Sequence, residues 1–238
     1  MHAVILAGGR GVRLGPITSY LPKPLVPIGD EYPILEVVIR QLKTQGFSRL
    51  TLAIGHLGHL IRACIGDGSR WDLDVRYVTE EEPLGTAGCL TDLRDELPEH
   101  FLVMNGDVLT NLDFAKLLDS HTSSSAPITV AVANRHLATE FGVLDLRGEM
   151  IAGIREKPVL DYQVSMGVYA VSRDVLKAYP PGEPLGFDRL LDDLVQRGTP
   201  PRAHIFDGYW LDIGRPDDYA RANEEFPQLR SLLLPHAG

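Results

Sequence analysis

Short apolar runs alternate with helical patterns through the first two thirds of the chain, and this alternation constrains the fold more than any other feature. Apolar residues at positions 34, 35, 38, 39 and 42 follow the period of a helix that ends at Gly46. Apolar strands are predicted at residues 3–7, 50–54, 74–79, 101–104 and 128–133, with further helices near 57–65, 86–96 and 113–121. Strands that alternate with helices build a largely parallel sheet covered on both faces, so we predict an α/β fold.

The pattern changes after about residue 134. Strands are predicted near 142–146, 151–155, 164–171 and 202–206, mixed with helices near 172–178, 187–197 and 215–225. With 238 residues, of which 44% are hydrophobic, the chain is long enough to bury one core without metal or disulfide support. We therefore expect a single domain over 1–238, with one lobe at about 1–134 and a second at about 135–238.

A glycine-rich loop that carries cations follows the first strand. Gly8, Gly9 and Gly11 let the backbone NH groups approach an anion, and the segment up to position 29 carries three positive charges in a chain of net charge -9. A phosphate site explains this local inversion of charge; a tight turn with solvated side chains is the alternative. The spacing excludes a P-loop, because no Gly-Lys-Ser/Thr follows, and the dinucleotide fingerprint, because its third glycine is replaced by Leu14.

Two motifs together resemble a known signature. Gly-Gly-Arg-Gly-Val-Arg-Leu at 8–14 and Leu-Pro-Lys-Pro-Leu at 21–25 resemble the signature of the sugar-1-phosphate nucleotidylyltransferases. Glu-Pro-Leu-Gly-Thr-Ala-Gly at 82–88 is similar to that of the mannose-1-phosphate and heptose-1-phosphate guanylyltransferases. The resemblance implies a Rossmann-like mixed, mostly parallel sheet flanked by helices, the nucleotide-diphospho-sugar transferase fold. No hexapeptide repeats follow residue 226, so we expect no C-terminal β-helix.

The resemblance also implies which residues bind the nucleoside triphosphate. These residues are Leu6, Ala7, Gly8, Gly9, Arg13, Lys23, Glu80, Gly85 and Thr86. Arg13 and Lys23 are expected to orient the β and γ phosphates and to offset developing charge, whereas Arg10 contacts phosphate or faces solvent. The family usually has threonine before the arginine and a Leu-Thr pair after the proline, where this chain has Val12 and Ile17-Thr18. The loop thereby loses one hydroxyl.

Two aspartates are candidate metal ligands. Asp107 follows the apolar strand at 101–104, and Asp212 ends an apolar run before a predicted helix. Mg²⁺ is typically held by one or two carboxylates with phosphate oxygens and water, and the resemblance assigns this role to these two positions. A turn-forming aspartate is the alternative for each. We therefore expect Mg²⁺ as cofactor, with Arg13, Lys23 and Asp107 as the catalytic residues.

The expected chemistry needs no general base. A phosphate monoester that attacks the α-phosphorus of a nucleoside triphosphate is already an anion at neutral pH, so catalysis must come from alignment and charge neutralisation. A site of this kind contains cations and metal ligands but no Ser-His-Asp triad. The motifs agree, because they contain no histidine and the chain has no Gly-x-Ser-x-Gly elbow.

Glu80 occupies the position where thymidylyl- and uridylyl-transferring relatives usually have glutamine. An ionised carboxylate only accepts hydrogen bonds, and guanine offers a ring NH beside an amino group. We therefore favour GTP over UTP or dTTP. The alternative is that Glu80-Glu81-Glu82 is a solvated loop face.

The sugar 1-phosphate is expected to bind the second lobe. The resemblance places Gly142 and Glu156 against sugar hydroxyls, Lys157 against the phosphate, and a further hydroxyl contact at Ser165, where the family usually has asparagine. Glu-Lys-Pro at 156–158 is otherwise an ordinary turn with a surface ion pair. The resemblance favours a sugar of the mannose or heptose type. Because serine is shorter than asparagine and offers one hydroxyl in place of an amide, the sugar is expected to be an unusual one.

Composition bounds the compartment and the partners. The pI of about 5.3 argues against nucleic acid or anionic membrane as partner. The sequence shows neither an apolar span nor a signal peptide, so a cytoplasmic protein with free thiols at Cys64 and Cys89 is expected, with a homodimer as one expected state. Two other functions remain as alternatives. A glycosyltransferase on the same fold would need an Asp-x-Asp metal motif, but Leu109 stands two residues after Asp107. A non-catalytic sugar-nucleotide-binding subunit should have lost a phosphate cation or a metal aspartate, whereas this chain retains Arg13, Lys23, Asp107 and Asp212.

Overall fold

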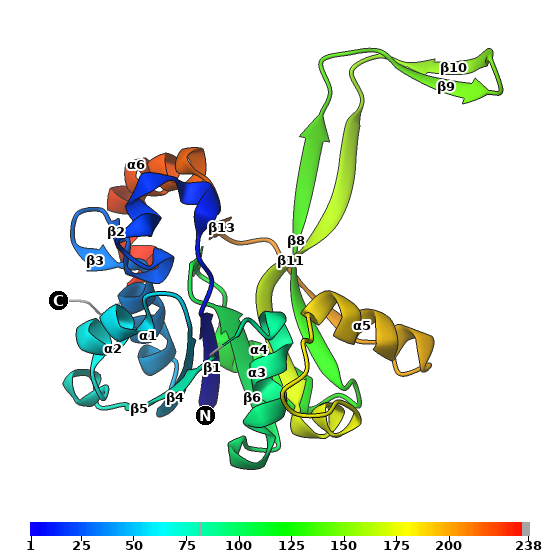
Figure 1. Cartoon of the computed structure of the whole chain (residues 1–238). Coiled ribbons are helices and arrows are strands. Elements are labelled where there is room, and N and C mark those ends of the chain that lie inside the picture. The colour runs from blue at the N-terminus through cyan, green and yellow to red at the C-terminus, as the bar shows by residue number, and fades with distance from the viewer. Residues whose placement is uncertain (81, 235–238) are drawn as a thin grey trace.

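A mixed, mostly parallel sheet forms the centre of the computed structural model, which describes residues 1–80 and 82–234 (Figure 1). Its seven strands lie in the order β12-β8-β11-β6-β1-β4-β5. They are β1 (His2–Ala7), β4 (Arg49–Ile54), β5 (Asp74–Thr79), β6 (His100–Asn105), β8 (Ile128–Ala138), β11 (Val159–Ser172) and β12 (Arg202–Phe206). Only β11 runs antiparallel to its neighbours in this sheet. The predicted α/β class is confirmed.

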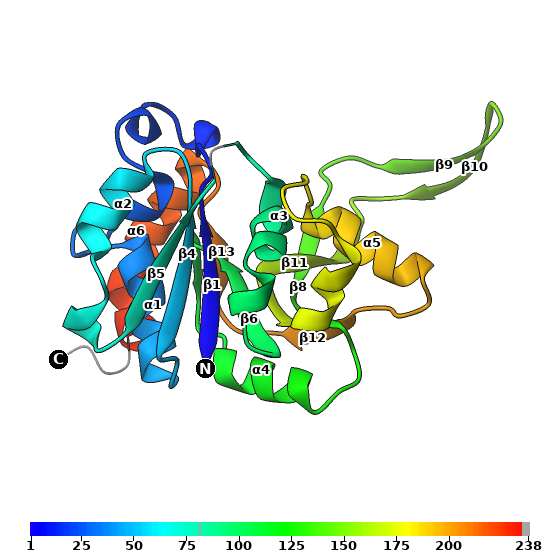
Figure 2. The same cartoon turned by 60° about the horizontal axis from the view of Figure 1, so that its bottom comes forward.

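Helices cover both faces of this sheet (Figures 1 and 2). They are α1 (Ile34–Thr44), α2 (Gly58–Ile65), α3 (Gly85–Asp92), α4 (Phe114–Thr122) and α5 (Phe187–Gln196), whereas α6 (Pro216–Leu233) packs against the N-terminal loop instead of on this sheet. Successive strand residues point to opposite faces, so Ile5 of β1 packs in the core with α1 and α4, while Val4 packs in the core with α3 and α5. The five apolar positions predicted on the first helix are all fully buried on α1, which confirms the stripe.

Three two-stranded sheets and several 3₁₀ turns complete the fold. The small sheets are β2 (Pro27–Ile28) with β3 (Tyr32–Pro33), β7 (Val108–Thr110) with β13 (Trp210–Asp212), and β9 (Val143–Arg147) with β10 (Met150–Arg155). The turns are Val12–Leu14, Pro16–Ser19, Lys23–Leu25, Ser69–Trp71, Arg94–Glu96 and Arg173–Ala178. A third apolar cluster, which includes Val26, Ile213 and Phe226, fastens the N-terminal loop to α6.

Strands β8 and β11 are longer than the sequence predicts. Their apolar parts, 128–133 and 164–171, are mostly buried in the sheet, but both strands continue outward as a paired ribbon to Ala138 and Val159. The tip of this ribbon is the β9–β10 hairpin, and Figure 1 shows the whole arm projecting away from the body. Residues 134–138 and 159–163 are held by strand pairing, with most of their side chains exposed, so hydrophobic periodicity does not reveal them.

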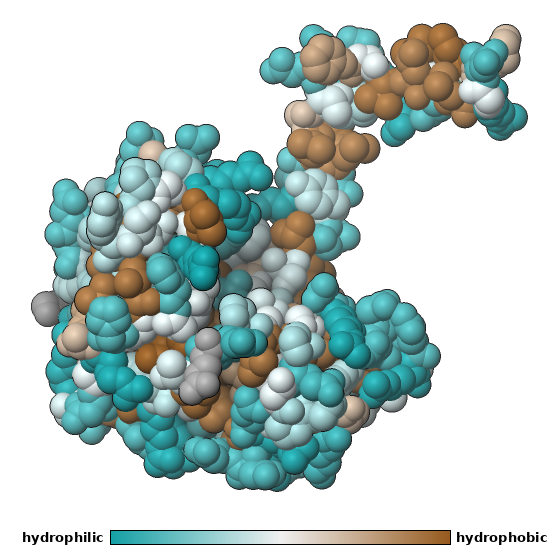
Figure 3. All heavy atoms as spheres, in the orientation of Figure 1, coloured by the Kyte–Doolittle hydropathy of each residue, from teal (hydrophilic) through white to brown (hydrophobic). Residues whose placement is uncertain are grey.

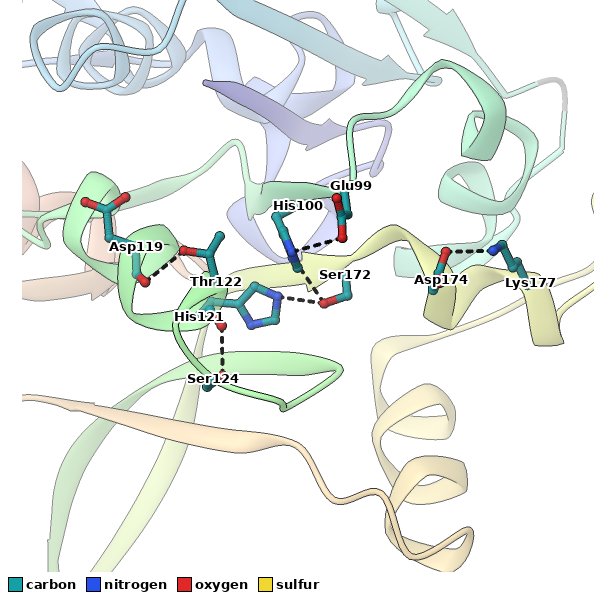
Figure 4. A network of polar contacts seen from close by, with 9 residues as sticks. All are labelled: Glu99, His100, Asp119, His121, Thr122, Ser124, Ser172, Asp174 and Lys177. Atoms are coloured by element: carbon teal, nitrogen blue, oxygen red, sulfur yellow. Dashed lines mark hydrogen bonds and ion pairs between the residues drawn. The ribbon is translucent and has the colours of Figure 1, made fainter.

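A polar network joins the amino ends of the parallel strands (Figure 4). His121 at the end of α4 is fully buried; its Nδ1 lies 3.0 Å from Thr129 Oγ1 and its Nε2 lies 3.0 Å from Ser172 Oγ. Ser172 Oγ lies 3.2 Å from Nδ1 of His100, whose ring meets that of His121 edge to face. The network ties α4 to β6, β8 and β11. None of the described helices is long and apolar enough to cross a membrane.

Candidate active site at the carboxyl ends of the strands

The loops after β1, β4 and β5 meet at one edge of the sheet. Gly8 follows β1 and Gly55 follows β4, and the two backbones touch: a Cβ on Gly55 would lie 2.9 Å from the Gly8 carbonyl oxygen. The backbone NH of Glu80, which follows β5, donates to Ile54 O at 3.0 Å. A pocket of about 280 Å³ opens here, lined by Gly8, Arg10, Gly55, His56, Glu80 and Pro83. Three strand ends thus form a small pocket with a glycine floor.

Sequence reasoning found two of these lining residues as site members and considered a third. Gly8 and Glu80 are among the residues predicted to bind the nucleotide. Arg10 is predicted either to contact phosphate or to face solvent, and in the structure its side chain is exposed and lines the pocket. Gly55 and His56 were missed. Their signal was their place directly after the apolar strand at 50–54, since ligands in such sheets bind beyond the carboxyl ends of strands.

Glu80 has the features of a carboxylate reserved for a ligand. Its Oε1 is buried and has no hydrogen-bond partner among the described residues. Burial raises the pKa of Glu80 above its ordinary value. Its other oxygen, Oε2, lies close to the glycine loop: a Cβ added to Gly8 would be only 3.0 Å from it. Glu81 lies outside the described residues.

Gly85 and Thr86, the first two residues of α3, contact the segment that leads into α5. Gly85 has a φ of +80°, and a Cβ there would lie 2.7 Å from the Leu185 carbonyl oxygen. Thr86 Oγ1 accepts a hydrogen bond of 3.0 Å from the backbone NH of Phe187, the first residue of α5. The pair therefore joins the loop after β5 to the segment that leads into α5, which sequence alone did not indicate.

The two predicted metal aspartates lie on neighbouring strands. Asp107 directly precedes β7, and Asp212 ends β13, where it pairs with Val108. The Ile213 backbone NH donates to the Asp107 carbonyl oxygen at 3.3 Å. Two residues that are distant in sequence are thus brought to the same strand end by the short β7–β13 ladder.

Charged side chains converge on these aspartates. Lys23 Nζ forms an ion pair with Asp107 Oδ2, and the lysine is buried in this contact. Asp107 Oδ1 is buried without a hydrogen-bond partner among the described residues. A Cβ on Gly214 would lie 3.3 Å from Asp212 Oδ2 and 3.8 Å from Arg13 Nη2, so the Arg13 guanidinium also reaches this cluster.

The electrostatics of the cluster favour a bound cation. Burial, and then the nearby charge of Asp107, raise the pKa of Asp212, while Lys23 and Arg13 act in the opposite direction. Two adjacent carboxylates, one with a free buried oxygen, fit the hard, oxygen-seeking divalent cations that also take phosphate oxygens as ligands. The residues present therefore fit Mg²⁺.

The predicted sugar-phosphate residues fall into two groups. Ser165 lies on β11 beyond the end of β6, where its hydroxyl donates to Tyr169 Oη at 3.0 Å. Gly142 and Glu156 adjoin each other, since a Cβ on Gly142 would lie 3.1 Å from Glu156 Oε2, and Lys157 follows. This second group sits at the base of the arm tip, out on the ribbon, and not in the cleft of its own chain (Figure 1).

Trp210 is a further residue that sequence reasoning did not assign. Its indole Nε1 donates to Met166 O at 3.0 Å, and the Arg135 guanidinium lies 4.4 Å from the ring centroid. It stands two positions before Asp212 on β13 and so connects this candidate metal ligand to the root of the arm. The sequence did contain a signal for Trp210, because it is an aromatic residue in the same short apolar run as the candidate ligand Asp212.

Comparisons with known proteins identify the family of this chain. A model of the nucleotidyl transferase family matches residues 2–228. Mannose-1-phosphate guanylyltransferase of Mycobacterium tuberculosis is 32% identical over 232 residues, which make up 94% of this chain and 64% of that protein. The chain thus spans less than two thirds of the mycobacterial relative. D-glycero-alpha-D-manno-heptose 1-phosphate guanylyltransferase of Aneurinibacillus thermoaerophilus is 31% identical over 229 residues, 94% of this chain and 98% of that protein.

A solved structure shares the fold. The crystal structure of HddC from Yersinia pseudotuberculosis complexed with GMP-PN superposes with a TM-score of 0.74 at 28% identity, covering 94% of this chain and 99% of that one.

The nucleotide named among relatives varies. UTP–glucose-1-phosphate uridylyltransferase of Synechocystis is 31% identical over 244 residues, 93% of this chain and 62% of that protein. Similarity of this degree identifies a family and leaves the nucleotide open.

Proposed function

Because the chain belongs to the sugar-1-phosphate nucleotidylyltransferases, within the nucleotidyl transferase family, we propose that it transfers the guanylyl group of GTP to a mannose- or heptose-type sugar 1-phosphate and releases pyrophosphate. The substrates at the level of the family are a nucleoside triphosphate and a sugar 1-phosphate. One observation carries the proposal: Asp107, with an unpartnered buried oxygen, lies beside Asp212 and Lys23 at the edge where the glycine loop ends. We propose one domain over 1–238, with lobes at about 1–134 and 135–238.

Charge neutralisation is the catalytic principle of the proposed site. Lys23 and Arg13 orient the triphosphate, and the ion pair with Asp107 holds the Lys23 ammonium in place before substrate arrives. Backbone NH groups of Gly8 and Gly9 face the phosphates, and Leu6 and Ala7 form the strand end beneath them. The sugar phosphate is its own anionic nucleophile, so no residue needs to remove a proton.

Proteins of this family generally use a divalent metal ion. We propose Mg²⁺, held by Asp107 and Asp212. When bound, it supplies positive charge to the phosphate oxygens and to the leaving pyrophosphate. The protein contributes the two carboxylates, whose mutual repulsion is relieved by a cation, and the neighbouring Lys23 and Arg13 keep them from excess negative charge.

The choice of GTP rests on Glu80. Its unpartnered buried oxygen can accept hydrogen bonds from the ring NH and amino group of guanine, a pair of donors that uracil lacks. Gly85 and Thr86 hold the next segment of the pocket, and relatives named guanylyltransferases are among the matches. UTP is the second candidate, because a uridylyltransferase is also similar to this chain.

A substrate panel tests the proposal. Four nucleoside triphosphates are each combined with glucose, mannose and heptose 1-phosphates in the presence of Mg²⁺, and pyrophosphate release is measured. We expect release with GTP and a mannose- or heptose-type phosphate, and release slowed at least about a hundredfold in Asp107→Asn. Release with UTP alone would contradict the guanylyl assignment. Hydrolysis or sugar transfer without pyrophosphate release would contradict the reaction itself.

A further inference from the structure

The β9–β10 tip of the arm has one apolar and one mixed face. Leu146 lies opposite Ile151 and Leu144 opposite Ile154, so these four side chains share one face of the two-stranded sheet. Leu146 is 61% and Ile154 66% exposed. The other face is mixed: it carries the Asp145–Arg155 ion pair of 3.0 Å and Arg147, together with Val143 and Met150. A regular alternation of this kind is typical of a hairpin that packs against a partner.

The body of the same chain does not supply that partner. Within the described residues, the hydrogen bonds and ion pairs formed by 139–158 stay inside this segment. Figures 1 and 2 show the tip away from the body, and Figure 3 shows apolar atoms gathered on it. An isolated two-stranded hairpin is marginally stable in water, and contiguous exposed apolar patches mark interaction surfaces.

The same arm carries residues that the proposed site needs. Gly142 precedes β9, and Glu156 and Lys157 follow β10, so all three flank the apolar hairpin. The cleft of one body contains the metal aspartates and the triphosphate cations but lacks the group expected to hold the sugar phosphate. The hairpin therefore needs a surface to cover it, and the body needs the residues that flank the hairpin.

A second copy of the chain satisfies both needs. Residues 143–155 contain two acids, Asp145 and Glu149, and two bases, Arg147 and Arg155, so the tip is neutral in a chain of net charge -9. Two bodies repel each other more than two tips do, which makes the tip the part of the surface best suited to self-association. In a two-fold dimer each copy offers the same patch, so one apolar face covers the other.

We propose that two copies of the chain exchange arms, so that the apolar faces of the tips pack together and Glu156 and Lys157 of each arm complete the cleft of the other copy. The second half of this statement rests on the proposed function, because it uses the sugar-phosphate role of those two residues. The first half rests only on the exposed apolar face and its charge balance.

Complementation between two inactive variants tests the exchange. Asp107→Asn damages the body, and the double variant Glu156→Ala, Lys157→Ala damages the arm. The two chains are co-expressed with different tags, and the mixed dimer is isolated through both tags. With exchange, one of the two sites contains an intact body and an intact arm, so about half of the wild-type rate returns. With an arm that serves its own body, every site carries a defect and no activity returns, which would overturn the proposal.

Sedimentation velocity tests the apolar face without any need for activity. Wild type is expected to sediment as a dimer, and Leu146→Asp with Ile151→Asp as a monomer. The two changes lie on the arm tip outside the core, so the circular dichroism spectrum, which reports the folding of the body, should be unchanged. Met150→Asp is the matched control, because Met150 is 73% exposed but lies opposite Arg147 on the other face. It should remain dimeric.

The two measurements separate the inference from the proposed function. A wild-type dimer that Leu146→Asp with Ile151→Asp dissociates, in a protein that releases no pyrophosphate, would support the interface while contradicting the proposed function. An active wild-type monomer would overturn the arm exchange while leaving the function intact. A dimer that is equally insensitive to Leu146→Asp, Ile151→Asp and Met150→Asp would also overturn it.

Discussion

The two ends of the central sheet differ in which of their buried polar side chains find partners within the protein. At the amino ends of β6 and β8, the side chains of His100, His121 and Ser172 contact one another (Figure 4), and His121 also contacts Thr129. At the amino end of β1, His2 Nδ1 is buried without a partner among the described residues. At the carboxyl ends, the described residues include two buried carboxylate oxygens without a partner, on Glu80 and Asp107. Unpartnered buried polar atoms are costly, and they persist where a ligand provides the missing partner. The His121 network therefore ties strands to α4, and the two unpartnered carboxylate oxygens at the carboxyl ends are the candidates for contact with a ligand.

Removing a carboxylate at the carboxyl end should have the largest effect on activity and little on folding. In Asp107→Asn we expect kcat to fall by a factor of about 10² to 10³, because the residues that would hold the divalent cation lose one of their two carboxylates. The fold should persist, since one of two adjacent negative charges is removed. Pyrophosphate release measures the change in kcat, and thermal melting measures the change in stability. A near-normal rate would disprove the metal assignment.

The amino end should behave in the opposite manner, with an effect on stability alone. Burial lowers the pKa of His121 from 6.5 to about 4, so between these pH values the unfolded chain binds a proton that the folded chain does not. Stability is therefore full above pH 6.5 and falls as the pH decreases, by about 2 kcal/mol between pH 7 and pH 5 for this one histidine. His2, whose pKa is also lowered to about 4 by burial, adds a loss of the same sign.

Urea unfolding at pH 7 and pH 5 checks this difference between the two ends. In His121→Gln the loss of unfolding free energy on acidification should be smaller than in wild type, while pyrophosphate release at pH 7 is kept. His59→Gln, at an exposed position on α2, is the control and should follow wild type. Equal pH dependence in all three proteins would show that the network at the amino end does not govern acid stability.

A moderate effect is expected from the second unpartnered carboxylate. Glu80→Gln should lower kcat/KM for GTP relative to UTP by about tenfold, because an amide presents a donor where guanine needs an acceptor. The exposed Glu82→Gln is a matched control on the same loop and should leave the ratio unchanged. If Glu80→Gln also leaves the nucleotide preference unchanged, recognition of the base lies elsewhere at this end of the sheet.

The smallest effect is expected at a departure from the family signature. Val12 is 79% exposed, so it contributes little to the core. Val12→Thr restores the hydroxyl that the family usually has there and should lower the KM for the triphosphate by less than about threefold, the range of one solvent-exposed hydrogen bond. Initial rates against GTP concentration measure it. A tenfold change would place the loop in closer contact with the triphosphate than its exposure indicates.

The sequence predicted those features that depend on local pattern. The buried stripe of α1, the order of strands and helices, and the glycine loop after β1 were all legible because periodicity and glycine spacing are local properties. The meeting of Asp107 with Asp212 was predicted only through the resemblance. The ladder that joins them pairs residues about a hundred positions apart, and no local pattern reports such a pairing.

The sequence by itself determined the α/β class, and it predicts a phosphate loop and the residue types that a metal and a guanine base would need. The tertiary structure alone decided where the arm goes, that Gly55 and His56 line the pocket, and that Glu156 and Lys157 lie outside the cleft of their own chain. The physical reason is the same in each case. Secondary structure follows from hydrophobic period along the chain, whereas positions in space follow from strand pairing and packing between segments that are distant in sequence.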